Sequence, residues 1–165
     1  MSERNFMQTA ADQARQTMRL GHGGPFGAAV VKDGRIIAVE SNSVLKDHDP
    51  TAHAEVNAIR KAGEVLGTHD LSGCELYATG YPCPMCLSAI IWANIKTVYY
   101  GCAPAEAEAV GFRDDFIYRF IEQGRAVQSK KFWKKIQHFD TRIQLNLKHF
   151  LVLFYVYPCI IVLLL

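Results

Sequence analysis

The chain contains two short motifs whose residue types can bind a metal ion. The first is the run His-Ala-Glu at residues 53–55, and the second is Pro-Cys-Pro-Met-Cys at residues 82–86. Zn²⁺ favours imidazole nitrogen and thiolate sulfur in tetrahedral geometry, and catalytic zinc sites use three protein ligands and leave the fourth position to water. We therefore expect His53, Cys83 and Cys86 to hold a catalytic zinc ion.

Glu55 belongs to the first motif but is not one of the three expected ligands. It follows His53 by two residues, so it is close enough to reach the same water without being needed as a ligand. A carboxylate in such a place can carry protons between water and a substrate. We expect Glu55 to be the catalytic residue, and the alternative is a solvated carboxylate that the helix dipole favours near a helix start.

The other cysteines show no metal or disulfide pattern. Of the five in the chain, three are scattered, at positions 74, 102 and 159. A Cys-x-x-Cys pair can also be a structural zinc site or a redox pair, but a structural site would need further cysteines or a second histidine at close spacing. This cysteine usage predicts a reducing compartment. The first 20 residues lack the apolar core of a signal peptide, so we expect a cytoplasmic protein.

Hydrophobic periodicity places these motifs in an alternating pattern of helices and strands. An Asp-Gly pair at residues 33–34 separates two apolar runs and indicates a β-hairpin. The helix beginning near residue 51 would carry His53 and Glu55 in its first turn, and both cysteines would lie at the start of the next helix. The predicted helices are 4–20, 51–66, 84–93, 104–110 and 114–123, and the predicted strands are 26–31, 35–40, 74–79 and 96–101. This order predicts an α/β fold, a three-layer α/β/α sandwich around a mixed sheet.

Composition divides the chain at about residue 128. Residues 1–128 carry 12 Lys and Arg against 15 Asp and Glu, whereas residues 129–165 carry 6 against 1 and contain no glycine. We expect residues 1–128 to form the zinc-dependent domain. We interpret residues 129–165, a basic and hydrophobic tail, as the product of a frameshift. A membrane anchor is the alternative, but the apolar run from 150 to 165 is short for a span and contains Pro158.

The motifs resemble those of the cytidine deaminase superfamily, since His-x-Glu followed by Pro-Cys-x-x-Cys is the known signature of zinc nucleobase deaminases. Within it, the chain looks most like the bacterial guanine deaminase branch, because Gly-Phe-Arg-Asp-Asp-Phe-Ile-Tyr at 111–118 is more discriminating than the zinc motif. Further similarity covers residues 23–28, 31–34, 49–55 and 58–62. The resemblance implies a mixed sheet of five strands in a cytidine deaminase-like fold. No match to the family's final strand and helix is found after about Val127.

The resemblance also implies roles in binding the base. Asn42 would hydrogen-bond the purine, Phe26 would stack on its ring, the backbone N–H of Ala54 would contact a ring carbonyl, and Asp114 would read or protonate the base edge. Simpler interpretations remain open for three of these residues. Asn42 could be a turn residue at a strand end, Phe26 a core residue and Asp114 the N-cap of a helix.

These motifs together predict a zinc-dependent aminohydrolase that converts a purine base, guanine, into xanthine and ammonia. The alternatives are a tRNA adenosine deaminase, a cytosine deaminase, or an inactive zinc-binding protein that serves only as an interaction partner. The acidic balance of residues 1–128 argues against nucleic acid as a partner. We expect no membrane partner. The resemblance implies a homodimer, with C-terminal segments exchanged between subunits.

Overall fold

The structure is a computed structural model, and it describes residues 3–103, 106–107, 111 and 115–122. The chain divides into two compact units, Met1–Tyr118 and Arg119–Leu165. Among the described residues, no helix combines the length and apolar character needed to cross a membrane. The predicted helix at 104–110 and the basic tail at 129–165 lie mainly or wholly outside the described residues.

Four strands form one mixed sheet in the part of the chain that the structure describes. They are β1 (Gly27–Lys32), β2 (Arg35–Ser41), β3 (Cys74–Gly80) and β4 (Thr97–Cys102), in the order β2-β1-β3-β4. Strand β1 is antiparallel to both neighbours, whereas β3 and β4 are parallel. The predicted mixed sheet is therefore confirmed for these four strands, and a fifth strand would fall outside the described residues.

The hairpin between β1 and β2 forms where the Asp-Gly pair predicted it. Lys32 pairs with Arg35, and the two residues between them, Asp33 and Gly34, have φ angles of 50° and 69°. Positive φ at both central positions defines the type I′ turn, whose twist matches that of paired strands. The register then shifts by one residue, which leaves Ile37 as an extra residue in β2.

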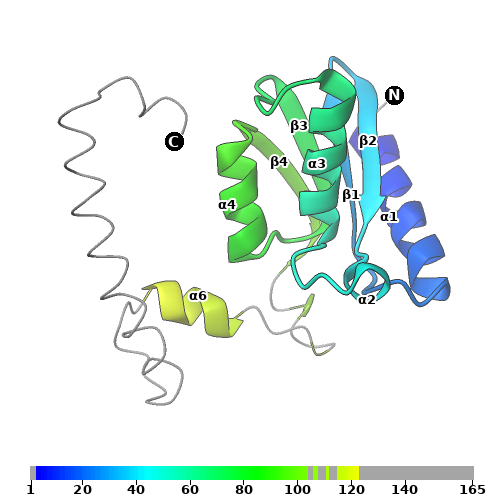
Figure 1. The fold of residues 1–165 in the computed structure, drawn as a ribbon, viewed down its shortest axis with the longest axis vertical. Coiled ribbons are helices and arrows are strands. Elements are labelled where there is room, and N and C mark those ends of the chain that lie inside the picture. Colours follow the sequence, from blue (N-terminus) through cyan, green and yellow to red (C-terminus); the bar gives the residue numbers. More distant parts are fainter. Residues whose placement is uncertain (1–2, 104–105, 108–110, 112–114, 123–165) are drawn as a thin grey trace. The chain divides into compact units, whose positions relative to one another are not determined.

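Helices cover both faces of the sheet and give three layers (Figure 1). Because successive side chains of a strand point to opposite faces, Ala28 and Val30 of β1 belong to one core cluster and Ala29 and Val31 to another. The helix α3 (Ala54–Leu66) packs on the first face beside α4 (Pro84–Trp92), and α1 (Glu3–Arg19) packs on the second. The predicted three-layer α/β/α sandwich is confirmed.

The face under α3 uses small side chains, which lets the helix approach the sheet closely. Ala54, Ala58 and Ala62 recur every four residues and are fully buried. The other face is built around aromatic rings, since Tyr77 stacks on Tyr99 at a centroid distance of 4.6 Å. The tight packing of α3 matters for the site because this helix begins at the zinc motif.

Two elements differ from the predictions. The short helix α2 (Val44–Asp47) was not predicted, because one helical turn carries no hydrophobic period. Helix α3 begins at Ala54 rather than near residue 51, so His53 precedes the helix instead of lying in its first turn. Helix α6 (Asp115–Glu122) agrees with the predicted helix at 114–123.

Candidate active site

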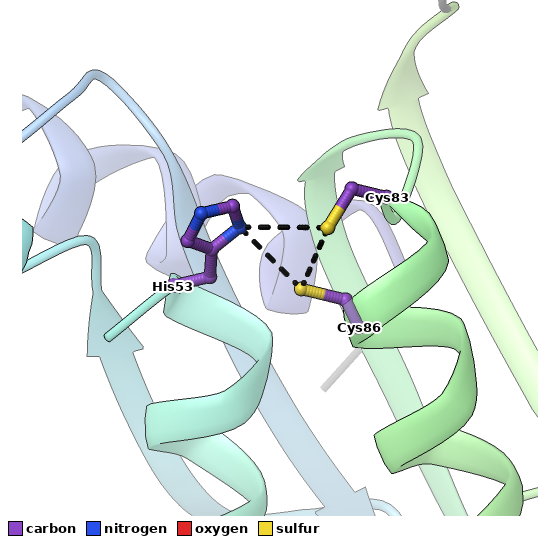
Figure 2. A group of neighbouring side chains, drawn as sticks. All are labelled: His53, Cys83 and Cys86. Atoms are coloured by element: carbon purple, nitrogen blue, oxygen red, sulfur yellow. Dashed lines mark hydrogen bonds between the residues drawn. The ribbon is translucent and has the colours of Figure 1, made fainter. Parts of the chain in front are cut away.

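The three predicted zinc ligands come together where α3 and α4 begin. His53 is the N-cap of α3 and Cys83 is the N-cap of α4, while Cys86 lies in the first turn of α4. Both N-cap residues have extended backbones, and neither side chain caps its own helix. Their side chains are thus available to point toward one another, as Figure 2 shows.

The distances between the ligand atoms fit a zinc ion. His53 Nδ1 lies 3.6 Å from the sulfur of Cys83 and 3.6 Å from that of Cys86, and the two sulfurs are 3.5 Å apart. Ligands at zinc bond lengths in tetrahedral geometry would be about 3.6 Å apart for a nitrogen and a sulfur and about 3.8 Å apart for two sulfurs. The donor set and its spacing therefore suit zinc, and three protein ligands leave the fourth tetrahedral position to water or substrate.

The two neighbouring thiols shift each other's pKa in opposite directions. The hydrogen bond from Cys86 lowers the pKa of the Cys83 thiol to about 4, and His53 contributes in the same direction. The same sulfur pairing, with burial, raises the pKa of Cys86. The opposite directions describe one thiolate that accepts a hydrogen bond from its neighbour. A bound cation favours the thiolate form of both sulfurs.

Glu55 is a buried carboxyl beside these ligands. It is 7 % exposed and lies in the first turn of α3. Burial raises the pKa of its carboxyl, and the charge of Cys83 acts in the same direction. A hydrogen bond from its own backbone N–H opposes the rise most, and the charge of His53 and a hydrogen bond with Cys86 oppose it further. A carboxyl in contact with a zinc ligand and held in a buried site is suited to moving protons at that site.

An apolar wall surrounds the sulfurs on the protein side. Cys83 and Cys86 form a buried cluster with Val56, and Met85 and Ala89 pack against it. Such a wall excludes water and strengthens the attraction between thiolates and a cation.

The structure gives each described base-contact candidate a definite environment. Asn42 is 7 % exposed, and its Oδ1 accepts hydrogen bonds from the backbone N–H of Gly24 at 3.1 Å and of Val44 at 3.3 Å. Phe26 is half-buried and packs against the core cluster under α3. Ala54 is the first residue of α3, so its N–H has no acceptor within the helix. Asp114 lies outside the described residues.

One contact near the site was not found by sequence reasoning. Tyr118 Oη donates a hydrogen bond of 2.7 Å to the carbonyl oxygen of Pro82, the residue before the ligand Cys83. Tyr81 packs edge-on against Tyr100, with ring centroids 5.0 Å apart, and its ring also lies 6.4 Å from that of Tyr118. Tyr118 belongs to the Phe-Ile-Tyr run of the discriminating stretch, and that run was the available signal.

A separate hollow lies away from the metal ligands. We call it the surface hollow: it has a volume of about 440 Å³ and is lined by α1, β2, α2 and α3, with Glu40, Lys46, Asp47 and Lys61 among its residues. None of the three zinc ligands lines it. Within the described part of the chain, His53, Cys83 and Cys86 form the one cluster of histidine, cysteine and acidic side chains that could hold a metal.

The sequence profile of the cytidine and deoxycytidylate deaminase zinc-binding region matches residues 1–102. The chain belongs to this family. Family membership agrees with the geometry of the ligands, and zinc is the cofactor. The protein is a zinc-dependent aminohydrolase of the deaminase family.

Similar proteins come from two branches of the family. The chain is 50 % identical to a guanine deaminase of Bacillus subtilis over 123 residues, which is 74 % of this chain and 79 % of the relative. It is 43 % identical to a tRNA-specific adenosine deaminase of Agrobacterium fabrum over 111 residues, 67 % of this chain and 72 % of the relative. A crystal structure of guanine deaminase from Bacillus subtilis superposes with a TM-score of 0.73 at 42 % identity, covering 86 % of this chain and 95 % of that one.

Proposed function

We propose that the protein hydrolyses guanine to xanthine and ammonia. The observation that carries the proposal is that His53, Cys83 and Cys86 come together beside the buried carboxyl of Glu55. The chain is also 50 % identical over 123 residues to a guanine deaminase. In the reaction, the bond between a ring carbon and its exocyclic amine breaks. A bond from that carbon to a water oxygen forms, and ammonia leaves.

Glu55 moves the protons in this proposal. His53, Cys83 and Cys86 would hold the zinc ion, which would supply a Lewis acid that makes water a better nucleophile near neutral pH. The Glu55 carboxylate takes a proton from the attacking water and passes protons to the ring nitrogen and the departing amine. Its place in the first turn of α3, two residues after the ligand His53, supports this role.

Four residues would hold the base in this proposal. Because Oδ1 of Asn42 accepts two backbone N–H groups, its amide nitrogen would be the donor to the purine. The N–H of Ala54 would contact a ring carbonyl and Phe26 would stack on the ring. Asp114 would read or protonate the base edge.

Ammonia release tests the proposal directly. The purified protein, with its zinc content measured, is offered guanine, adenine, cytosine, their nucleosides and a tRNA anticodon stem-loop. We expect ammonia and xanthine from guanine alone. Bound zinc with every substrate left unchanged would instead identify an inactive zinc-binding protein, whose function would be interaction only.

Adenosine in tRNA is the second candidate substrate. The 43 % identity to a tRNA-specific adenosine deaminase favours it. The charge of residues 1–128, with 12 basic against 15 acidic side chains, argues against it, because binding to phosphates needs a basic surface. Release of ammonia from the stem-loop, with no reaction on free guanine, would overturn the first proposal in favour of the second.

The proposal extends to the organisation of the protein. We propose that residues 1–128 form the deaminase domain, that the tail at 129–165 arises from a frameshift, and that the enzyme is a cytoplasmic homodimer. We propose further that the two subunits of this dimer exchange their C-terminal segments. Resequencing the locus tests the frameshift, and light scattering on the purified protein tests the dimer.

A further inference from the structure

The side-chain amide of Asn57 lies within hydrogen-bond distance of three oxygen atoms that belong to three segments of the chain. The two N–H groups of its Nδ2 are shared among the carbonyl oxygen of Ser41 at 3.0 Å, the hydroxyl of Ser43 at 2.9 Å and the carbonyl oxygen of Ala52 at 3.3 Å. Ser41 ends β2, Ser43 leads into α2, and Ala52 precedes α3. One side chain therefore joins three segments that the chain folds together.

These segments carry one proposed base contact, Asn42, and one zinc ligand, His53. Ser41 and Ser43 flank Asn42, and Ala52 immediately precedes the ligand His53. The backbone N–H of Asn57 also donates to the carbonyl oxygen of His53 at 2.9 Å. Asn57 thus bonds to both neighbours of the proposed base contact and to the segment that carries a zinc ligand.

The position of the Asn42 side chain depends on this loop. Its Oδ1 is held by backbone N–H groups of Gly24 and Val44. A Cβ at Gly23 would lie only 2.2 Å from the Asn42 amide oxygen, so this amide sits where glycine alone leaves room for it. A movement of the loop would therefore stretch the hydrogen bond from Gly24 and displace the proposed donor to the purine.

The surface hollow lies against the same contacts, since Ser41, Ser43 and Asn57 all line it. If Asn57 were shortened, water could enter from this side and hydrogen-bond the exposed oxygens. The backbone N–H of Ser43 would still donate to the carbonyl oxygen of Ala52 at 3.0 Å. The water would satisfy the acceptors that Asn57 leaves, but this single backbone bond would then be the only one of the described contacts left between Ser43 and Ala52. We therefore expect variants at Asn57 to fold while holding the loop less accurately.

We propose that Asn57 is a positioning residue that fixes the loop at 41–43 against the segment at 52–53, and so sets the position of Asn42 relative to the zinc ligands. The kinetic part of this inference rests on the proposed deamination of guanine. The geometric part does not, because it concerns the placement of the loop in the protein itself. Substitution should raise KM for guanine more than it lowers kcat.

Two substitutions separate hydrogen bonding from space filling. Asn57→Ala removes the amide, and Asn57→Asp keeps its shape but turns a carboxylate toward three oxygen acceptors. We expect both to lower kcat/KM for guanine by roughly tenfold to a hundredfold, mainly through KM, with one zinc per chain retained. Asn5→Ala and Asn5→Asp, at an exposed asparagine of α1, are the matched controls and should change neither constant.

Kinetic results of two kinds would overturn the inference. An Asn57→Asp enzyme with wild-type KM would show that shape, and not donation, is what matters at this position. A fall in kcat that follows the fraction of folded protein, at constant KM, would show a role in stability alone. Ser43→Ala removes one of the three acceptors and should give a smaller rise in KM, which tests the idea even if Asn57→Ala fails to fold.

Hydrogen exchange provides a test that needs no substrate. The backbone N–H groups of Gly24 and Val44 should exchange at least about tenfold faster in the Asn57 variants. The amides where Val30 pairs with Leu76, in the β1–β3 ladder, should keep their rates. Unchanged exchange at Gly24 and Val44 would overturn the positioning role. Faster exchange in a protein that deaminates no base would support positioning while rejecting the proposed function.

Discussion

The metal corner and the surface hollow both gather polar side chains, but they do so in opposite ways. The metal corner consists of only four such side chains, those of His53, Glu55, Cys83 and Cys86. Glu55 and both cysteines are buried, and the ligand atoms lie within 4.8 Å of one another. The surface hollow has more charged groups, and two of them, Lys61 and Glu64, are exposed and form an ion pair within α3.

Lys61 illustrates the second arrangement. Its ammonium group lies 2.9 Å from the carboxylate of Glu64, and the two side chains are 45 % and 72 % exposed. Water screens such pairs, and they contribute little to stability. Reactive chemistry therefore depends less on how many charges a region has than on whether they converge in a buried place that water does not screen. Four predictions test this difference.

Loss of a zinc ligand should have the largest effect. Cys86→Ala removes one of three ligands and leaves a gap in a fully buried position. We expect the variant to lose its zinc, to show only background deamination and to melt at a lower temperature, because metal binding to the folded state stabilises it. Metal analysis, activity and thermal unfolding measure these changes.

Cys102→Ala is the matched control for the missing ligand. Cys102 is half-buried at the end of β4 and its sulfur contacts the carbonyl oxygen of Ala103. It should keep zinc and activity. A Cys86→Ala protein with full zinc content would contradict the proposed ligand set.

Removal of the buried carboxylate should come next in size. Glu55→Gln keeps the shape of the side chain but cannot accept a proton from water, so we expect kcat to fall by about 10²- to 10⁴-fold with zinc retained. Glu64→Gln, an exposed carboxylate of the same helix, should keep nearly full activity. Near-normal turnover by Glu55→Gln would exclude the proton-carrying role.

A charge deletion in the surface hollow should have little effect. Lys61→Ala removes an exposed ion pair, and we expect the free energy of unfolding to change by less than about 0.5 kcal/mol. The value of kcat/KM for guanine should stay within about twofold of the wild type, since Lys61 lines a hollow that contains no zinc ligand. A large loss of activity would show that this exposed ion pair, and not only the Asn57 contacts, contributes to the site.

The smallest effect concerns an exposed carboxylate and should depend on pH. Hydrogen bonds from Ser72, and one from Asn94, lower the pKa of Asp70, in contrast to the raised pKa of buried Glu55. A lowered folded-state pKa stabilises the fold above the unfolded value of about 3.9, and this contribution disappears as pH falls through the folded-state pKa. Asp70→Asn should therefore be slightly less stable than the wild type at pH 7.

Urea unfolding at several pH values measures this difference. The gap between Asp70→Asn and the wild type should narrow as the pH falls below about 3.9. A gap that stays constant with pH would mean that the hydrogen bonds of Asp70 do not depend on its charge.

Local sequence was sufficient for much of the fold. The Asp-Gly pair predicted a hairpin because few other residues tolerate positive φ. The structure has positive φ at both residues. The alanines of α3 recur at helical spacing, and Pro84 suits the first turn of α4. The start of α3 was misplaced by a few residues, because Pro50 and Thr51 do not show where the first helical hydrogen bond forms.

The zinc ligands themselves were also predictable, because the chemistry of each ligand is local. Histidine and cysteine are zinc ligands by residue type, and the spacing of Cys83 and Cys86 places both sulfurs at one helix start. The spacing between His53 and Cys83 carries no such information. These two residues meet because α3 and α4 pack side by side on one face of the sheet (Figure 1).

The sequence by itself therefore determined which residues can bind zinc and where most of the helices and strands lie, and it predicted Glu55 as the proton carrier. The tertiary structure decided the burial of Glu55, the separation of the surface hollow from the metal corner and the three contacts of the Asn57 amide. The physical reason is the separation along the chain of the residues that decide each property. Backbone conformation and ligand chemistry follow from neighbouring residues, whereas burial and side-chain contacts depend on atoms that only the packing of distant segments brings together.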